Sequence, residues 1–135
     1  MSWQIGSVLA PLTKPAITRE QLRSYAEAAA DHNPIHLDEK FAQEAGFPSV
    51  IVHGMISMAF LGDLIRHNFD ETSYRLSRFQ SRFRKVTFPG DIIRCEGEIK
   101  KIQPDGATVV AVRARNQREE VTTEGEATLY PLETR

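Results

Sequence analysis

In the first half of the chain, apolar residues recur at the three- and four-residue spacing typical of helices. One such run follows Thr18, and its members are Leu22, Tyr25, Ala26 and Ala29. Thr18 and Gln21 form a capping-box pattern at its start. We expect this helix to end near Asp31, because Pro34 disfavours helical geometry at Asn33.

Two further helices are predicted before residue 70. Asp38 is a typical cap for a short helix that Gly46 would end. A longer helix begins after His53-Gly54, and its apolar positions are Ile56, Ala59, Phe60, Leu64 and Ile65. Because apolar residues surround much of it, we expect this helix to be buried and to end at residues 68–70.

After Asp70 the apolar period changes to two, which is typical of strands. The predicted strands cover residues 74–88, 92–102, 107–115 and 121–130, separated by turns that include Pro89-Gly90. Residues 7–12 predict one more short strand, which Pro11 restricts to an edge or end. Helices followed by a meander of antiparallel strands indicate an α+β fold, with the sheet wrapped around the buried helix.

Composition narrows the class of protein. A chain of 135 residues, 41% hydrophobic and 26% charged, fits one globular domain that needs no metal or disulfide for its core. The net charge of −1 does not favour nucleic acid or an anionic membrane as a partner. The N-terminus lacks the blocks of a signal peptide, and Cys95 is the lone cysteine, so we expect a reducing, cytoplasmic location.

The segment Asp31-His32-Asn33-Pro34-Ile35-His36 is the main chemical candidate. A carboxylate and an imidazole held by a turn that Pro34 stiffens are suited to proton transfer with a water between them. Asn33 would hold the same water or fix the turn. The alternative is that Asp31 caps a helix end and His36 packs, since Asp, Asn and Pro are common in turns. From these residues alone, both interpretations stay open.

His53-Gly54 is the second candidate. A backbone N–H in the first turn of a buried helix has the positive end of the helix dipole behind it and can stabilise a developing oxyanion. The alternative is that Gly54 only permits a tight entry into the helix.

Two other clusters of side chains have a possible chemical role. His32 and His36 with nearby carboxylates suggest metal ligands, but the Asn33-Pro34 break keeps the two histidines off one helical face, so we predict no metal site. Basic residues crowd the first long strand and indicate either a solvated face or contacts to a phosphate-bearing thioester or an acidic carrier protein. Arg82 and Arg84 share a face and are the better phosphate candidates.

Together these residues resemble the MaoC-like (R)-specific enoyl-CoA hydratase family. The matching segments are Tyr25-Ala26, Asp31 to Asp38, Phe41-Ala42, Gly46-Phe47-Pro48, Ile51 to Met55, Ser81 to Val86 and Phe88 to Asp91. Two departures stand out. Ala30 replaces the glycine that often precedes the aspartate, and a serine common in the early central helix has no clear counterpart among Ser57, Ala59 and Gly62.

The resemblance implies a single hotdog domain over residues 1–135, with a curved antiparallel sheet around the helix that begins near Gly54. Family members hydrate trans-2-enoyl thioesters of CoA or acyl carrier protein to (3R)-hydroxyacyl thioesters, or run the reverse dehydration, without a cofactor. They are usually homodimers or dimers of dimers with sheets joined edge to edge. By this resemblance Asp31 and His36 activate water and Gly54 polarises the thioester carbonyl. The expected substrate-binding residues are Asn33, His53, Ser57, Arg82 and Arg84.

Two alternatives remain beside this expectation. A hotdog acyl-thioesterase would need a carboxylate aimed at the carbonyl carbon, and hydrolysis does not need an Asp31–His36 pair. A non-catalytic acyl-thioester-binding domain would not need both residues either, so we expect turnover. Acyl chain length, the carrier and the physiological direction stay open.

Overall fold

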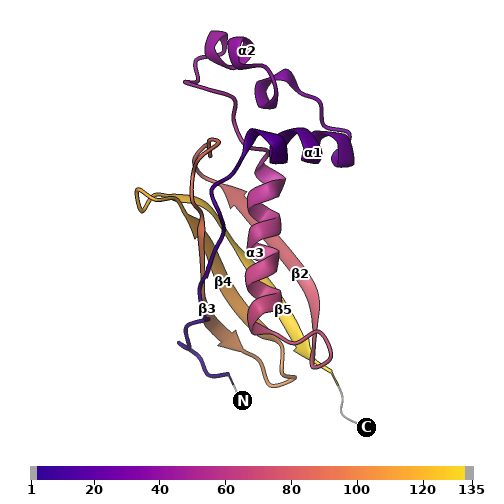
Figure 1. Cartoon of the computed structure of the whole chain (residues 1–135). Coiled ribbons are helices and arrows are strands. Elements are labelled where there is room, and N and C mark those ends of the chain that lie inside the picture. Colours follow the sequence, from indigo (N-terminus) through magenta and orange to yellow (C-terminus); the bar gives the residue numbers. More distant parts are fainter. Residues whose placement is uncertain (1–2, 133–135) are drawn as a thin grey trace.

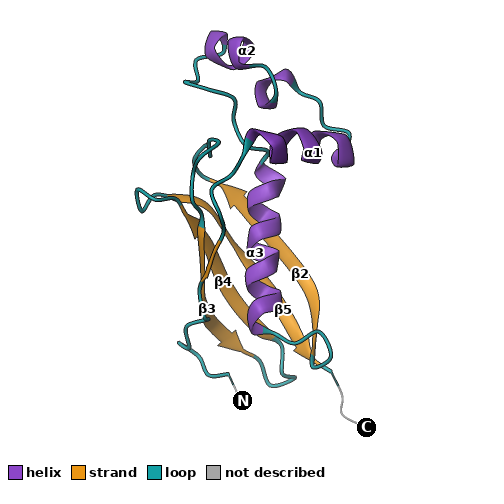
Figure 2. Cartoon of the chain, viewed as in Figure 1, coloured by secondary structure: helices purple, strands orange, loops and turns teal. Residues whose placement is uncertain are grey.

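One antiparallel sheet curves around a long helix, and the shorter helices lie beyond one end of that sheet (Figure 1). The computed structural model describes residues 3–132. Its helical elements are α1 (Arg19–Ala29), the 3-10 helix η1 (Pro34–His36), α2 (Glu39–Glu44) and α3 (Gly54–Asn68). Its strands are β1 (Leu12–Thr13), β2 (Tyr74–Phe83), β3 (Arg94–Ile102), β4 (Thr108–Arg115) and β5 (Val121–Pro131). Figure 2 shows α3 lying along the sheet and the other labelled helices beyond the end of the strands, which confirms the predicted α+β hotdog arrangement.

The helix ends follow the local sequence signals. Thr18 and Gln21 form the predicted capping box at the start of α1, and the Asp38 side chain accepts a hydrogen bond from the Phe41 N–H at the start of α2. The C-cap of α1 is Ala30, which has left-handed backbone angles (φ 54°, ψ 35°). Because these signals depend on neighbours in the sequence, the three helices were predicted to within a few residues.

Two strand predictions were wrong in extent. β2 ends at Phe83 instead of Phe88, because the Arg84 and Lys85 N–H groups both donate to the Thr122 carbonyl oxygen and the ladder stops. The predicted strand over residues 7–12 is reduced to an isolated bridge at Val8, and β1 forms only at Leu12–Thr13. β1 does lie at an edge of the sheet, as Pro11 led us to expect.

The predicted meander was wrong for one strand. The sheet order is β1-β3-β4-β5-β2, so β2 pairs with β5 and lies at the opposite edge from β1. Residues 84–93 therefore cross to the other side of the sheet rather than forming a hairpin. This crossing is tied to the helical segments, because Val52 N–H donates to the Thr87 carbonyl and Ile17 N–H donates to the Asp91 carbonyl.

The core lies between α3 and the concave face of the sheet. The buried residues of α3 are Ile56, Ser57, Phe60, Leu61, Leu64 and Ile65. They meet inward-facing sheet residues that include Ile99, Val110, Val112, Ala127 and Leu129. The other face of α3 is only partly covered, and Met55 is 52% exposed, so the helix is buried on one side rather than all round. Within residues 3–132, none of the helices has both the length and the apolar character needed to span a bilayer.

Candidate active site

Contacts of His53 join the residue that follows α1 and the helix η1 to the start of α3. Asp31 follows α1, His36 is the last residue of η1, and His53 immediately precedes α3. A carboxylate oxygen of Asp31 and a ring nitrogen of each histidine all lie within 4.8 Å of one another. The structure thus brings Asp31 and His36 together and adds His53 to the pair.

The turn that carries Asp31 is held by its own backbone. The Asp31 N–H donates to the Ala26 carbonyl oxygen at 3.0 Å, which ties the turn to the end of α1. The Asn33 side chain accepts a hydrogen bond from the Ile35 N–H at 3.1 Å, and Pro34 begins η1. Asn33 therefore fixes the turn, which is one of the two roles predicted for it.

His36 has a defined tautomer. Its Nδ1 atom lies 2.7 Å from the carbonyl oxygen of Ile51. Because a carbonyl oxygen only accepts hydrogen bonds, the neutral ring carries its proton on Nδ1 and has a lone pair on Nε2. The Ile51 N–H in turn donates to the Ile35 carbonyl at 3.1 Å, so the segment before α3 holds η1 from both directions.

His53 is the buried member of the group, with only 2% of its surface exposed. Its ring stacks on that of His36 at a centroid distance of 3.8 Å and an interplanar angle of 23°. On another side it contacts the ring of Tyr25 at 4.7 Å. Burial lowers the pKa of His53, and the neighbouring His36 lowers it further. His53 is thus an uncharged residue behind the pair, whereas it was expected to touch the substrate.

Asp31 is exposed and His36 is half-buried, so both can reach a ligand. A water molecule at hydrogen-bond distance, about 2.6–3.2 Å, from both groups fits a separation of polar atoms of up to 4.8 Å. This arrangement can take a proton from the water and return it to a neighbouring atom of a bound molecule.

Gly54 begins α3 and lies under an aromatic ring. A Cβ atom added to Gly54 would lie 2.9 Å from Cζ of Phe83, closer than side chains tolerate. The preceding His53 makes no side-chain cap, so the first turn of α3 depends on other partners for its N–H groups. A larger residue here would displace the Phe83 ring, which is the end of an exposed side chain, and the Gly54 N–H lies at the positive end of the helix dipole.

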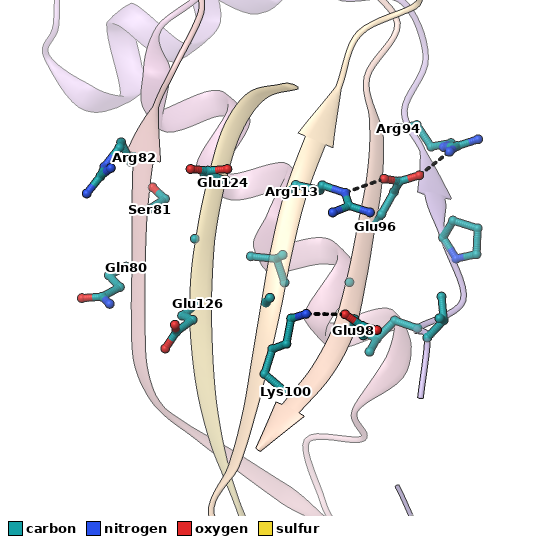
Figure 3. Close-up of a pocket in the computed structure, with 17 residues that line it drawn as sticks. Gln80, Ser81, Arg82, Arg94, Glu96, Glu98, Lys100, Arg113, Glu124 and Glu126 are labelled. Atoms are coloured by element: carbon teal, nitrogen blue, oxygen red, sulfur yellow. Dashed lines mark hydrogen bonds and ion pairs between the residues drawn. The ribbon is translucent and has the colours of Figure 1, made fainter. Parts of the chain in front are cut away.

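The other predicted site residues lie apart from this group. Ser57 is buried on α3 with 2% exposure. Arg84 forms an ion pair with Glu124 at 2.5 Å. Arg82 points from β2 onto the face of the sheet away from α3, where Glu124 is also found (Figure 3). The two arginines are thus not gathered with Asp31 and His36.

That outer face carries a shallow depression of about 780 Å³ across all the long strands (Figure 3). Its charges are largely matched within the sheet. Glu96 binds Arg94, Arg113 and Arg115, and Glu98 pairs with Lys100. This balance favours the interpretation of the basic strand residues as part of a solvated face.

Two smaller grooves flank the partly covered side of α3. One, of about 380 Å³, is mostly apolar and lies between α3 and β2, with Gly62, Ile65 and Leu76 in its wall. The other, of about 430 Å³, lies between α1 and α3 and includes Tyr25. Both are lined by Ala59, so they meet on the helix. The Tyr25 ring in the wall of the second groove packs on His53.

Among the described residues, Asp31, His36 and His53 offer ligand atoms that lie close enough together to suggest a metal site. Lone pairs of imidazoles lie in the ring planes, so two rings stacked at 23° direct theirs side by side rather than toward one ion. The geometry therefore does not suit a shared metal ion, and the absence of a metal site stays a prediction.

Two contacts of the site had no signal in the sequence. Tyr25 fitted the apolar stripe of α1, and nothing marked its contact with His53. Phe83 fitted the strand alternation, and its position over Gly54 depends on how β2 ends. Only a long-range pairing pattern between these segments would have revealed either contact.

The chain is similar in sequence to proteins that include a fatty acid synthase and a 3-hydroxyacyl dehydratase. Fatty acid synthase 2 of Mycosarcoma maydis is 32% identical over 111 residues, which are 76% of this chain and 3% of that protein. The mitochondrial 3-hydroxyacyl-acyl-carrier-protein dehydratase of Arabidopsis thaliana is 31% identical over 90 residues, 67% of this chain and 52% of that protein. The chain thus spans no more than about half the length of these curated relatives.

Solved structures agree over nearly the full chain. The unliganded R-hydratase PhaJ1 of Pseudomonas aeruginosa superposes with a TM-score of 0.87 at 27% identity, covering 98% of this chain and 84% of that one. An (R)-hydratase of A. caviae gives 0.86 at 25% identity, covering 96% and 97%. The family model described as MaoC like domain matches residues 4–122. With this match over most of its length, the chain belongs to the MaoC-like domain family.

Proposed function

We propose that this protein is a hydro-lyase that adds water to trans-2-enoyl thioesters to give (3R)-hydroxyacyl thioesters, or catalyses the reverse dehydration. The observation that carries the proposal is the pairing of an exposed Asp31 carboxylate with the His36 ring, within reach of a single water. The similarity to (R)-hydratases and to a 3-hydroxyacyl dehydratase supports the same reaction class.

In the hydration direction, Asp31 and His36 hold the water, and one of them takes a proton from it. The resulting hydroxyl bonds to C3 of the enoyl group, and negative charge moves to the thioester oxygen. The Gly54 N–H, at the start of α3, stabilises that oxygen. The proton then passes from the pair to C2, so that the pair returns to its initial state and one water has been added. Proton transfers of this kind contribute about 10²–10⁴ in rate each.

The grooves on α3 support a place for the acyl chain. Ala59 and Gly62 are small residues that leave the side of the helix open, and the wall of the groove toward β2 is mostly apolar. The carrier, CoA or acyl carrier protein, would enter from the exposed side of Asp31. For phosphate contacts, Arg84 is already paired with Glu124, which leaves Arg82 as the better candidate.

A homodimer or dimer of dimers is part of the proposal. β2 pairs with β5 on one side and lies at the edge of the sheet, so its other side presents unpaired backbone groups. Leu76 is 44% exposed and Phe83 52% exposed on the same strand. An edge-to-edge contact through β2 would cover both features.

We place the protein in the cytoplasm, which suits a chain whose lone cysteine is reduced and buried.

The test is incubation with crotonyl-CoA while the enoyl absorbance and the free thiol are followed together. Loss of the absorbance without thiol release is the expected result. Release of CoA with the double bond retained would overturn the hydratase proposal in favour of a thioesterase. No change with any chain length or carrier would leave a thioester-binding domain as the function.

A sharper version uses Asp31→Asn, which removes the charge and keeps the shape of the side chain. We expect turnover to be lost while thioester binding and the melting temperature are retained. Normal turnover by this variant would show that Asp31 has no catalytic role.

A further inference from the structure

The residue before α3 has an unusual position for its type. Helix N-caps are usually Ser, Thr, Asp or Asn, because their side chains bind a free N–H of the first turn. His53 stands at this position without a side-chain cap and is 98% withdrawn from solvent, since 2% of its surface is exposed. His53 neither caps the helix nor contacts solvent to any extent. Its role must therefore come from the residues that it contacts.

His53 touches both members of the proposed catalytic pair. Its Nε2 atom lies 3.3 Å from the Asp31 carbonyl oxygen, and its ring lies flat on that of His36. Asp31 and His36 belong to a short turn whose other hydrogen bonds are those within the turn and to the end of α1, and the contact of His36 with Ile51. One ring therefore spans the two residues and joins them to the rigid start of α3.

The protonation state of His53 follows from the same contacts. The Asp31 carbonyl oxygen accepts only, so Nε2 carries the ring proton and donates to it. Nδ1 is buried and has no hydrogen-bond partner within the described residues. A second proton on Nδ1 would be buried without an acceptor beside the His36 ring, and burial lowers the pKa of His53 accordingly.

We propose that His53 is a positioning residue for the Asp31–His36 pair, in which its Nε2–H holds the Asp31 backbone and its flat ring supports His36. This inference rests on the proposed function and replaces the expectation that His53 binds substrate. The N–H donor sets the geometry of the pair, whereas the ring mainly fills the space between Tyr25 and His36.

Two variants separate the donor from the ring. His53→Phe keeps a flat ring and loses the donor, and His53→Gln keeps a terminal N–H donor and loses the ring. We expect His53→Phe to lower kcat about tenfold or more with KM within about twofold, because a misplaced catalytic group costs rate rather than binding. We expect His53→Gln to keep more of kcat than His53→Phe even though it melts at a lower temperature.

This inverse order of activity and stability is the result that a purely structural histidine cannot give. The matched control is His32→Gln, which makes the same change at an exposed histidine of the same turn and should leave kcat and melting temperature unchanged. If His53→Phe keeps kcat within twofold of the wild type, or if both variants lose kcat in proportion to melting temperature, the positioning role is wrong.

Amide hydrogen exchange tests the same idea without turnover. His53→Phe should speed exchange at Asp31 and His36, whose N–H groups are bonded to Ala26 and Asn33, and His53→Gln should speed it less. Unchanged exchange in His53→Phe would overturn the positioning role. If the wild-type protein fails to hydrate enoyl thioesters, the proposed function is wrong. The exchange experiment would still test whether His53 holds Asp31 and His36 in place, because it does not depend on turnover.

Discussion

The carbonyl oxygen of Ile51 lies 2.7 Å from Nδ1 of His36, and this contact leaves Nε2 as the basic atom of the ring. The carbonyl belongs to the segment that leads into α3, so the same backbone that presents Gly54 also sets the orientation of His36. The two halves of the proposed reaction, proton transfer and stabilisation of the oxyanion, thus share one structural support.

His36→Gln should remove this base while keeping a polar side chain of similar length. We expect kcat for enoyl hydration to fall at least about 10²-fold with little change in the free energy of unfolding, since the ring is only half-buried. Steady-state kinetics with crotonyl-CoA and a urea titration measure the two effects. A variant with wild-type kcat would show that Asp31 acts without His36.

Gly54→Ala tests the packing requirement at the start of α3. The new methyl group would lie 2.9 Å from the tip of the exposed Phe83 ring, which must rotate away, so we expect destabilisation of about 0.5–1.5 kcal/mol and a matching loss of activity. The backbone N–H is unchanged by this substitution. The double variant Gly54→Ala/Phe83→Leu should therefore recover most of both losses, with Phe83→Leu alone as its control. If the double variant folds well but stays inactive, the methyl group itself blocks the thioester oxygen.

Ala30 is a site where the chain departs from the glycine common in the family. Its left-handed conformation (φ 54°) costs an L-residue about 1–2 kcal/mol. Glycine removes this strain, but the greater entropy of its unfolded chain offsets part of the gain. We expect Ala30→Gly to raise the free energy of unfolding by about 0.5–1 kcal/mol. Ala28→Gly, in the last turn of α1, should instead lower it by up to about 1 kcal/mol, and urea unfolding of both variants checks the contrast.

Glu96 gives a prediction for pH. Partial burial alone would raise the pKa of Glu96, but hydrogen bonds from Arg113, Arg115 and Arg94 outweigh it and lower the pKa from 4.5 to about 2. A lowered carboxyl pKa adds stability that is complete above the unfolded value and is lost as pH falls from about 4.5 toward 2. Glu96→Gln should therefore destabilise the protein by about 1–2 kcal/mol at pH 7 and by much less at pH 3.

Thermal unfolding at the two pH values measures that difference. Glu98→Gln is the control, because Glu98 has a single ion pair, with Lys100, and both side chains are largely exposed. Equal losses at pH 7 and pH 3 for Glu96→Gln would mean that the carboxylate charge does not stabilise this face of the sheet.

The helices and the Asp31–His36 pair could be predicted from the sequence because their signals are local. Capping residues at Thr18 and Asp38 mark helix starts within one turn, and Pro34 ends a helix by direct steric conflict. Asp31 and His36 lie five residues apart, so one tight turn brings them near each other, although their orientation depends on Ile51 and His53.

The pairing of strands could not be read in the same way. Alternation of apolar and polar residues predicts a strand but does not specify which strand it pairs with, so the sequence alone favours pairing between neighbours in sequence. The pairing of β2 with β5 instead joins residues some 50 positions apart, such as Leu76 and Leu129, which no local pattern links. The same long-range packing decides that Phe83 covers Gly54 and that Tyr25 contacts His53.

Cys95 has a practical consequence for the assay of this protein. The thiol is fully buried on β3, and burial raises its pKa to about 12, so almost no thiolate is present near neutral pH. It is the chain's single cysteine. Thiol reagents in a reaction mixture will thus report coenzyme released from a thioester without a background from the folded protein, and a cysteine introduced at the surface will be the one position that takes a fluorescent label.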